Sequence, residues 1–153
     1  MNSRIIKLGD VFEIETSKGK SYLHYIYKDK TLGNLIRVLP SVFKEKPDNM
    51  DEIISQKEDY MIFFALPISI KMKIVRFVGF YPIDNFTKPE FMRIEHNIRG
   101  DHLGWDIVNT ETWNIQFVEE LNGKQKKLSP WGIWSGNLLK ENIERGWNLE
   151  NWC

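Results

Sequence analysis

Apolar and polar residues alternate near the start of the chain. Over residues 12–16, phenylalanine, isoleucine and threonine alternate with Glu13 and Glu15. A period of two is typical of a strand that buries one face and exposes the other, which places both glutamates on the solvated face. Residues 17–20 predict a short turn, and the aromatic and β-branched run 22–27 predicts the returning strand of a hairpin.

The segment after this hairpin changes in character. Residues 35–39 predict a third strand that ends before Pro40, because proline cannot donate a hydrogen bond within a sheet. The segment 41–59 then carries lysines, a proline and acidic residues, which predicts a solvated excursion from the sheet. Within it, Asn49 is positioned to cap a short helix with an acidic first turn.

Two apolar runs follow in the middle of the chain. Residues 60–66 and 73–81 are apolar on both faces, which predicts two central strands covered on each side. The stretch between residues 82 and 90 contains two prolines and predicts irregular structure, and residues 91–95 predict a short strand.

The strongest local turn signal lies in the last third of the chain. Residues 113–117 alternate between apolar and polar side chains, and Asn122-Gly123 follows. An Asn-Gly pair favours a two-residue hairpin turn, because both central positions of that turn need a positive φ. We therefore predict a hairpin whose second strand spans residues 124–128.

A helix is predicted near the C-terminus. Ser135 supplies the N-cap, and Gly146 supplies the positive-φ residue that ends the helix. Its apolar stripe consists of Leu138, Leu139, Ile143 and Trp147. Together these elements predict one α+β, mostly β domain over residues 1–153: a strongly bent antiparallel sheet or a small SH3-like barrel, with a C-terminal helix packed on it.

The charge balance argues against a general nucleic-acid binder. The chain has 21 basic and 21 acidic residues, whereas such binders usually carry a basic excess that neutralises phosphates.

The only cysteine, Cys153, excludes an intrachain disulfide and favours a reducing compartment. The first residues lack the apolar region of a secretory signal, and the longest uncharged apolar stretch, residues 60–70, is shorter than the roughly 20 residues that span a membrane. These features predict a cytoplasmic protein with neither nucleic acid nor membrane as a partner.

Few residues are arranged for chemistry. His96, Asp101 and His102 lie close together in the sequence and form the best candidate for a metal site, which would make the chain a metal-dependent enzyme or a nucleotide-binding β domain. Their spacing does not match a known ligand motif, and Asp and His are also common turn residues. The sequence contains no nucleophile elbow and no glycine-rich phosphate loop, which argues against an enzyme and predicts no cofactor.

The tryptophans have two interpretations. Tryptophan is frequent at interface hot spots, but it also fills cores. Trp134 precedes the predicted N-cap, which favours a role as a core residue that fixes the start of the helix. Trp105 and Trp152 lie among polar residues and are expected to be exposed, so Trp105 is a candidate for partner binding.

Acidic residues gather around the predicted excursion. The group consists of Asp51, Glu52, Glu58 and Asp59. A solvated loop explains such a group, and an acidic patch that attracts a basic partner explains it as well.

Three stretches of the chain resemble a known family. They are KLGDVFEIETSKGKSY at residues 7–22, KIVRFVGFYPI leading into KPEFMRI at residues 73–94, and LSPWGIWSGNLLKENIERGW at residues 128–147. In this order they resemble the immunity protein 26 family of bacterial polymorphic-toxin systems. The sequence departs from the family in its long 41–59 and 97–109 segments.

The resemblance implies a function by binding. Members of that family are expected to be cytoplasmic proteins that bind and block the toxin encoded beside them, without catalysis. We therefore expect a cognate toxin domain as the partner and a monomer or weak homodimer as the state of the chain. The acidic group and Trp105 are the candidate contact residues.

Overall fold

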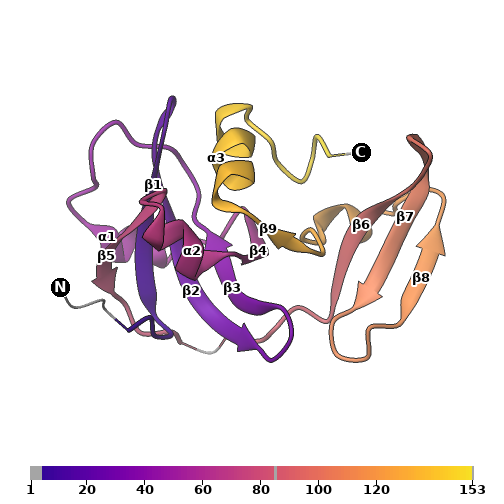
Figure 1. Ribbon diagram of the computed structural model, residues 1–153, viewed down its shortest axis with the longest axis horizontal. Helices are drawn as coiled ribbons and strands as arrows, with labels where there is room; N and C mark the ends of the chain where they lie inside the picture. Colours follow the sequence, from indigo (N-terminus) through magenta and orange to yellow (C-terminus); the bar gives the residue numbers. More distant parts are fainter. Residues whose placement is uncertain (1–4, 85, 153) are drawn as a thin grey trace.

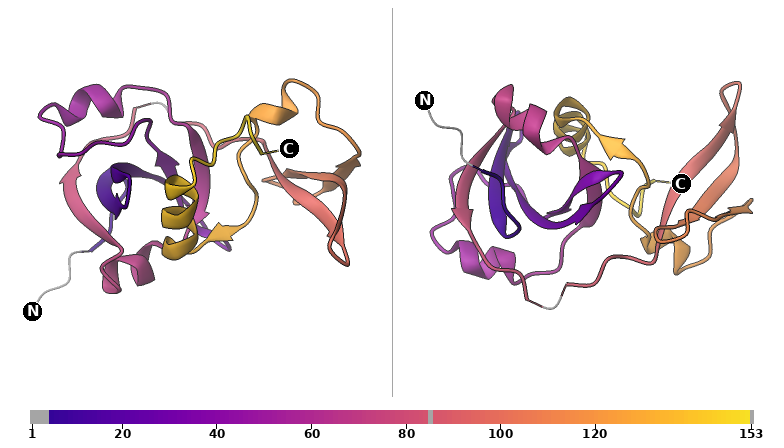
Figure 2. Two further views of the ribbon diagram at one scale, coloured as in Figure 1. Left: turned by 90° about the horizontal axis from the view of Figure 1, so that it is seen from above. Right: turned by 60° about the horizontal axis from the view of Figure 1, so that its bottom comes forward.

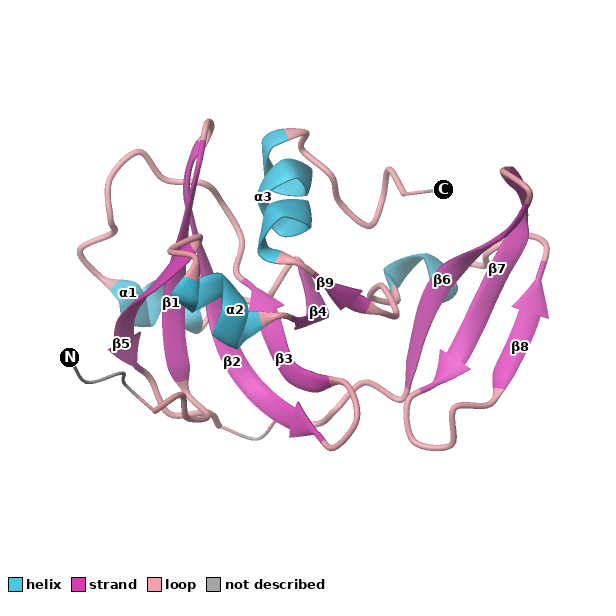
Figure 3. Ribbon diagram, viewed as in Figure 1, coloured by secondary structure: helices cyan, strands magenta, loops and turns pink. Residues whose placement is uncertain are grey.

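The computed structural model describes residues 5–84 and 86–152 and shows a mostly β, α+β architecture with two sheets (Figure 1, Figure 3). The larger sheet contains β1 (Asp10–Thr16), β2 (Gly19–Asp29), β3 (Gly33–Val38), β4 (Tyr60–Phe64), β5 (Val75–Phe80) and β9 (Ile133–Trp134). The smaller sheet contains β6 (Phe91–Ile98), β7 (Asp101–Asn109) and β8 (Ile115–Val118). The helices are α1 (Met50–Ile54), α2 (Leu66–Lys71), α3 (Gly136–Glu144) and the 3-10 helix η1 (Gln125–Lys127). None of the helices in the described ranges is both long and apolar enough to cross a membrane.

The larger sheet is mixed and open. Its strand order is β5-β1-β2-β3-β4-β9, and β4 and β9 run parallel, whereas the other neighbours are antiparallel. The prediction of an antiparallel sheet is therefore wrong at this last pair. Figure 2 shows that the sheet curls, but its edge strands β5 and β9 do not pair within residues 5–84 and 86–152. The SH3-like barrel, one of the two predicted forms, is accordingly not closed.

One face of the larger sheet carries the main core. Alternate residues of its strands point to this face, as a period of two requires, and they pack against Leu66 at the start of α2 and Leu139 of α3. The helix α3 confirms the predicted C-terminal helix, and the Ser135 hydroxyl accepts a hydrogen bond from the backbone N–H of Leu138 at 3.1 Å. Trp134 is buried there against Tyr60 and Trp147, as expected for a core residue.

The opposite face of the same sheet is covered at its two ends. The predicted short helix is present as α1, with the Asn49 side chain accepting a hydrogen bond from Glu52 N. Its Met50 and Ile53 pack on β1 and β2 at one end of this face. At the other end, Met92 of β6 packs on side chains of β2, β3 and β4 and joins the two sheets.

The predicted hairpin of β1 and β2 is confirmed, but the two glutamates of β1 differ. Glu15 is exposed, whereas Glu13 is 2% exposed and accepts hydrogen bonds from the Tyr22 hydroxyl at 2.8 Å and from Arg76 at 2.6 Å. Burial alone would raise the pKa of the Glu13 carboxyl, but these hydrogen bonds and the neighbouring positive charges outweigh it and lower the pKa. The predicted solvation of Glu13 is wrong, because its partners come from the two strands that flank β1.

Two strand predictions need correction. Of the two runs predicted as central strands, β4 is central, but β5 is an edge strand whose Phe77 and Phe80 are 37% and 45% exposed.

The predicted hairpin at Asn122-Gly123 is not formed. Instead β8 pairs with the preceding strand β7, and the turn between them contains Trp113 at φ 64. The Asn122 side chain accepts a hydrogen bond from Gln125 N at 2.8 Å and so begins η1, and the dipeptide lies in a helical turn.

Arg93 of β6 holds the C-terminal segment to the smaller sheet. Its side chain is fully buried, and its guanidinium lies 4.6 Å from the ring centre of Trp105 and 4.1 Å from that of Trp152. The same guanidinium donates hydrogen bonds to four backbone carbonyl groups: Lys126, Leu128, Leu149 and Trp152. Trp105 is therefore 3% exposed, and the prediction that it is exposed is wrong, because this stack covers it. Trp152 was also predicted to be exposed, and the structure shows it half-buried.

Candidate functional site

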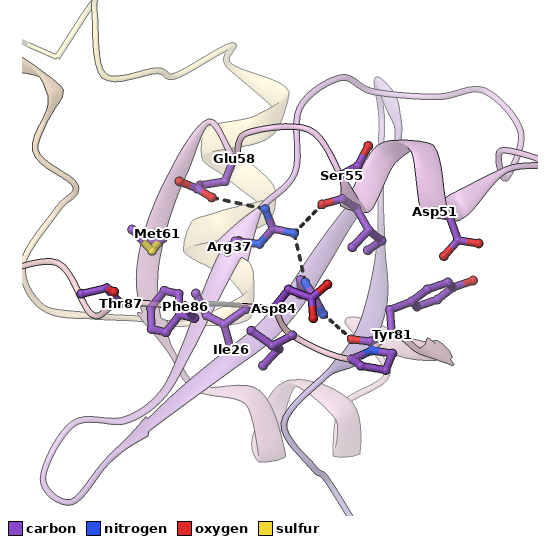
Figure 4. Close-up of a pocket in the computed structure, with 14 residues that line it drawn as sticks. Ile26, Arg37, Asp51, Ser55, Glu58, Met61, Tyr81, Asp84, Phe86 and Thr87 are labelled. Atoms are coloured by element: carbon purple, nitrogen blue, oxygen red, sulfur yellow. Dashed lines mark hydrogen bonds and ion pairs between the residues drawn. The ribbon is translucent and has the colours of Figure 1, made fainter.

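A pocket of about 790 Å³ opens on the face of the larger sheet opposite α3, between α1 and residues 81–84 and 86–87 (Figure 4). Its volume falls in the range of small-ligand sites, about 300–1,000 Å³. Strands supply the floor, and α1 together with residues 81–84 and 86–87 supplies the walls. The lining side chains are His24, Ile26, Arg37, Asp51, Ile54, Ser55, Glu58, Met61, Tyr81, Pro82, Ile83, Asp84, Phe86 and Thr87.

The floor is a row of side chains that cross three strands. His24 of β2 lies opposite Arg37 of β3, and Arg37 lies opposite Met61 of β4, so the sheet register places all three on one face. The Arg37 guanidinium is held by four contacts. Its Nη1 donates to Gln56 O at 3.2 Å and to a Glu58 carboxylate oxygen at 3.3 Å, and its Nη2 donates to Ile54 O at 2.8 Å and to a His24 ring nitrogen at 3.1 Å.

These contacts determine the protonation of His24. Because an arginine can only donate, the His24 Nδ1 that faces Arg37 must be the acceptor. The other ring nitrogen, Nε2, then carries the proton and donates to Tyr81 O at 2.8 Å. Burial, together with the positive charge of Arg37, holds the pKa of His24 below its usual value. The imidazole is neutral, and both of its nitrogens are engaged.

The rim of the pocket carries the negative charge. Three carboxylates line it: Asp51 on α1, Glu58 between α1 and β4, and Asp84 after β5. Figure 4 shows Glu58 beside Arg37, and Asp51 farther away on α1. Glu58 is engaged by Arg37. Within residues 5–84 and 86–152, the Asp51 and Asp84 carboxylates have no hydrogen-bond or ion-pair partner, and both residues are exposed.

The four acidic residues of the predicted contact group do not lie together. Asp51 and Glu58 line this pocket, and Glu52 is exposed on α1 outside the lining. Asp59 lines a separate cavity of about 240 Å³ beside Tyr60 and Trp147. Asp59 is exposed, but partial desolvation beside this cavity raises the pKa of its carboxyl.

The predicted metal candidates are also separated. His96 hydrogen-bonds to Asp106 at 3.0 Å, and its ring packs on Phe117. His102 lies in β7, where its ring nitrogen is 3.1 Å from the Asn97 side-chain oxygen. Throughout the described part of the chain, no three His, Cys, Asp or Glu side chains come together in a group that would hold a metal ion.

Sequence reasoning missed most of the pocket lining, including His24, Arg37, Asp84 and Phe86. One signal was present: Arg37 interrupts an otherwise apolar strand, LIRVL, at a position that faces the same side as His24. A buried-strand arginine indicates a buried acceptor or a functional cavity. Residues 81–84 and 86–87 carried no such signal, because their place over the sheet depends on long-range packing.

Comparisons with known proteins found no match for this chain. No protein-family model, no curated protein and no solved structure matches it.

Proposed function

We propose that this chain is a non-catalytic, cytoplasmic immunity protein that binds one cognate toxin domain and neutralises it, with the pocket over β2, β3 and β4 at the centre of the contact. The proposal that the partner is a toxin is motivated by the resemblance of the three sequence stretches to the immunity protein 26 family. The pocket supports the part of the proposal that concerns binding.

The observation that carries this proposal is how the polar groups of the pocket are engaged. Arg37 and His24 are bonded to one another and to backbone carbonyl groups, so they hold the floor in shape. A general base needs a free lone pair that reaches a substrate proton. The His24 nitrogens do not offer one, whereas the rim offers for recognition two carboxylates that have no partner among the described residues. This arrangement favours a recognition surface over a reaction centre.

The excursion at residues 41–59 supports the same assignment. It lies outside the three stretches that carry the resemblance and contributes α1, Ser55 and Glu58 to the pocket wall. A surface segment outside the strands of the sheet is where a specific partner is expected to bind.

Co-expression with the toxin tests the proposal. The toxin domain encoded beside this chain is produced alone and together with it in a bacterial host, and survival is measured. We expect protection, a complex that co-elutes in size-exclusion chromatography, and a calorimetric stoichiometry of one to one. Protection by protein present at well below one equivalent would indicate turnover and contradict a binding mechanism. Absence of any complex with the co-encoded toxin would contradict the function itself.

A further inference from the structure

The pocket is more acidic than the chain as a whole. Its lining contains three carboxylates and one guanidinium, while the complete chain has equal numbers of acidic and basic residues. Because His24 is neutral, it adds no positive charge. We propose that this pocket takes a basic side chain, arginine or lysine, from the partner protein, together with an apolar residue beside it. This inference rests on the proposed function and names the chemistry of the segment that the site recognises.

The charges of the pocket argue against an anionic ligand. Phosphate or carboxylate groups would need free donors, but the four contacts of the Arg37 guanidinium are made within the chain. An anion in the pocket would instead approach the Asp51 and Asp84 carboxylates, which is unfavourable. A cation meets the opposite situation, since these two carboxylates have no partner within residues 5–84 and 86–152.

The apolar part of the lining fits the rest of such a segment. Ile26, Met61 and Phe86 form an apolar surface below the acidic rim. Basic side chains lay their methylene groups along apolar surface and keep their charge near water, which places the charge at the level of the rim. The volume of about 790 Å³ lies in the range of pockets that enclose drug-sized ligands, so the pocket has room for a basic side chain and its apolar neighbour together.

A peptide titration tests this assignment without the toxin. The probe is a blocked pentapeptide with a central arginine flanked by leucines, and its control replaces the arginine by citrulline, which has the same shape and no charge. Both are titrated into the full ¹⁵N-labelled chain at low salt while backbone amide shifts are recorded. We expect the arginine peptide to shift amides of β2, β3 and α1, and the citrulline peptide to bind at least about 5-fold more weakly.

Two double variants locate the charge. Asp51→Asn with Asp84→Asn removes these two rim carboxylates and is expected to weaken binding of the arginine peptide about 3- to 10-fold. Glu45→Gln with Asp48→Asn removes two acids that are also exposed but lie outside the pocket, and it is expected to leave binding within about 2-fold. Neither variant touches a buried contact, so both are expected to fold.

The outcomes separate this inference from the function. Equal binding of the arginine and citrulline peptides, shifts confined to other surfaces, or equal losses in the two double variants would each overturn the basic-segment assignment. If the toxin is then still bound one to one, the immunity function stands and only this assignment fails. If the peptide behaves as expected and the toxin is not bound, the assignment stands and the toxin is not the partner.

Discussion

Replacing Arg93 is expected to release the C-terminal segment from the smaller sheet. In Arg93→Met, the apolar stem is retained, but the four carbonyl groups that accept from the guanidinium lose their donor. Each buried acceptor left without a donor costs about 1–3 kcal/mol. Two cation–π contacts of about 0.5–2 kcal/mol each are also lost. Part of this loss is recovered when the segment opens to water, so we expect a net loss of about 3–5 kcal/mol, the range for breaking a buried charged network.

Urea denaturation followed by tryptophan fluorescence measures this loss, since Trp105 and Trp152 lie on the guanidinium. The matched control is Arg99→Met, an exposed arginine at the other end of the same strand pair, which should cost at most about 0.5 kcal/mol. Arg93→Lys provides a milder variant, because a single ammonium cannot reach all four carbonyl groups. A loss below about 1 kcal/mol in both Arg93 variants would refute the reasoning.

Three further predictions concern the core, the pocket and the glycines. Trp134→Ala should lower the free energy of unfolding by about 3–5 kcal/mol in the same assay, because the side chain is 8% exposed, whereas Leu138→Ala on the exposed side of α3 should cost below about 1 kcal/mol. The lowered pKa of His24 means that the unfolded chain binds a proton that the folded chain does not, so stability should fall as pH drops below about 6.5, and His24→Gln should flatten that dependence; an unchanged pH profile of the melting temperature would show that His24 is not responsible. Gly104→Ala should cost about 1–3 kcal/mol, because its Cβ would lie 2.5 Å from a carbonyl oxygen of β8, while Gly123→Ala meets nothing within 4 Å and should change stability by less than about 1 kcal/mol; equal effects in denaturation would contradict this pair.

Sequence reasoning succeeded where the decisive interactions are local. The hairpin of β1 and β2, the caps of α1 and α3, and the burial of Trp134 follow from neighbouring residues and were predicted. The dipeptide Asn122-Gly123 was misleading because the Asn122 side chain accepts a hydrogen bond from Gln125 N, and a 3-10 helix rather than a strand follows. The preceding residues of β8 pair with β7 instead, where Phe117 lies over Gly104.

Sequence reasoning recovered only half of the acidic contact group for the pocket. Asp51 and Glu58 were found because they are close in sequence and share a charge. Arg37 and Asp84 come from distant segments that only the folded sheet brings together. The alternation of apolar and polar residues along one strand does not reveal which residues of other segments lie beside it. The same reason explains Trp105, since the polar sequence around it gave no sign of the stack made by Arg93 and Trp152.

The parallel pair of β4 and β9 has a consequence for the order of folding. Phe64 and Trp134 pair in register, although all strands of the smaller sheet lie between them in the sequence. Closing so long a loop costs conformational entropy, which only the contacts between β4 and β9 can offset. This pairing is therefore expected to form late. Until then β4 is a bare strand edge with unpaired backbone groups, which is a template for association with another chain. A chain cut after residue 130 would keep that edge permanently open, and it should aggregate during refolding under conditions where the full chain remains monomeric.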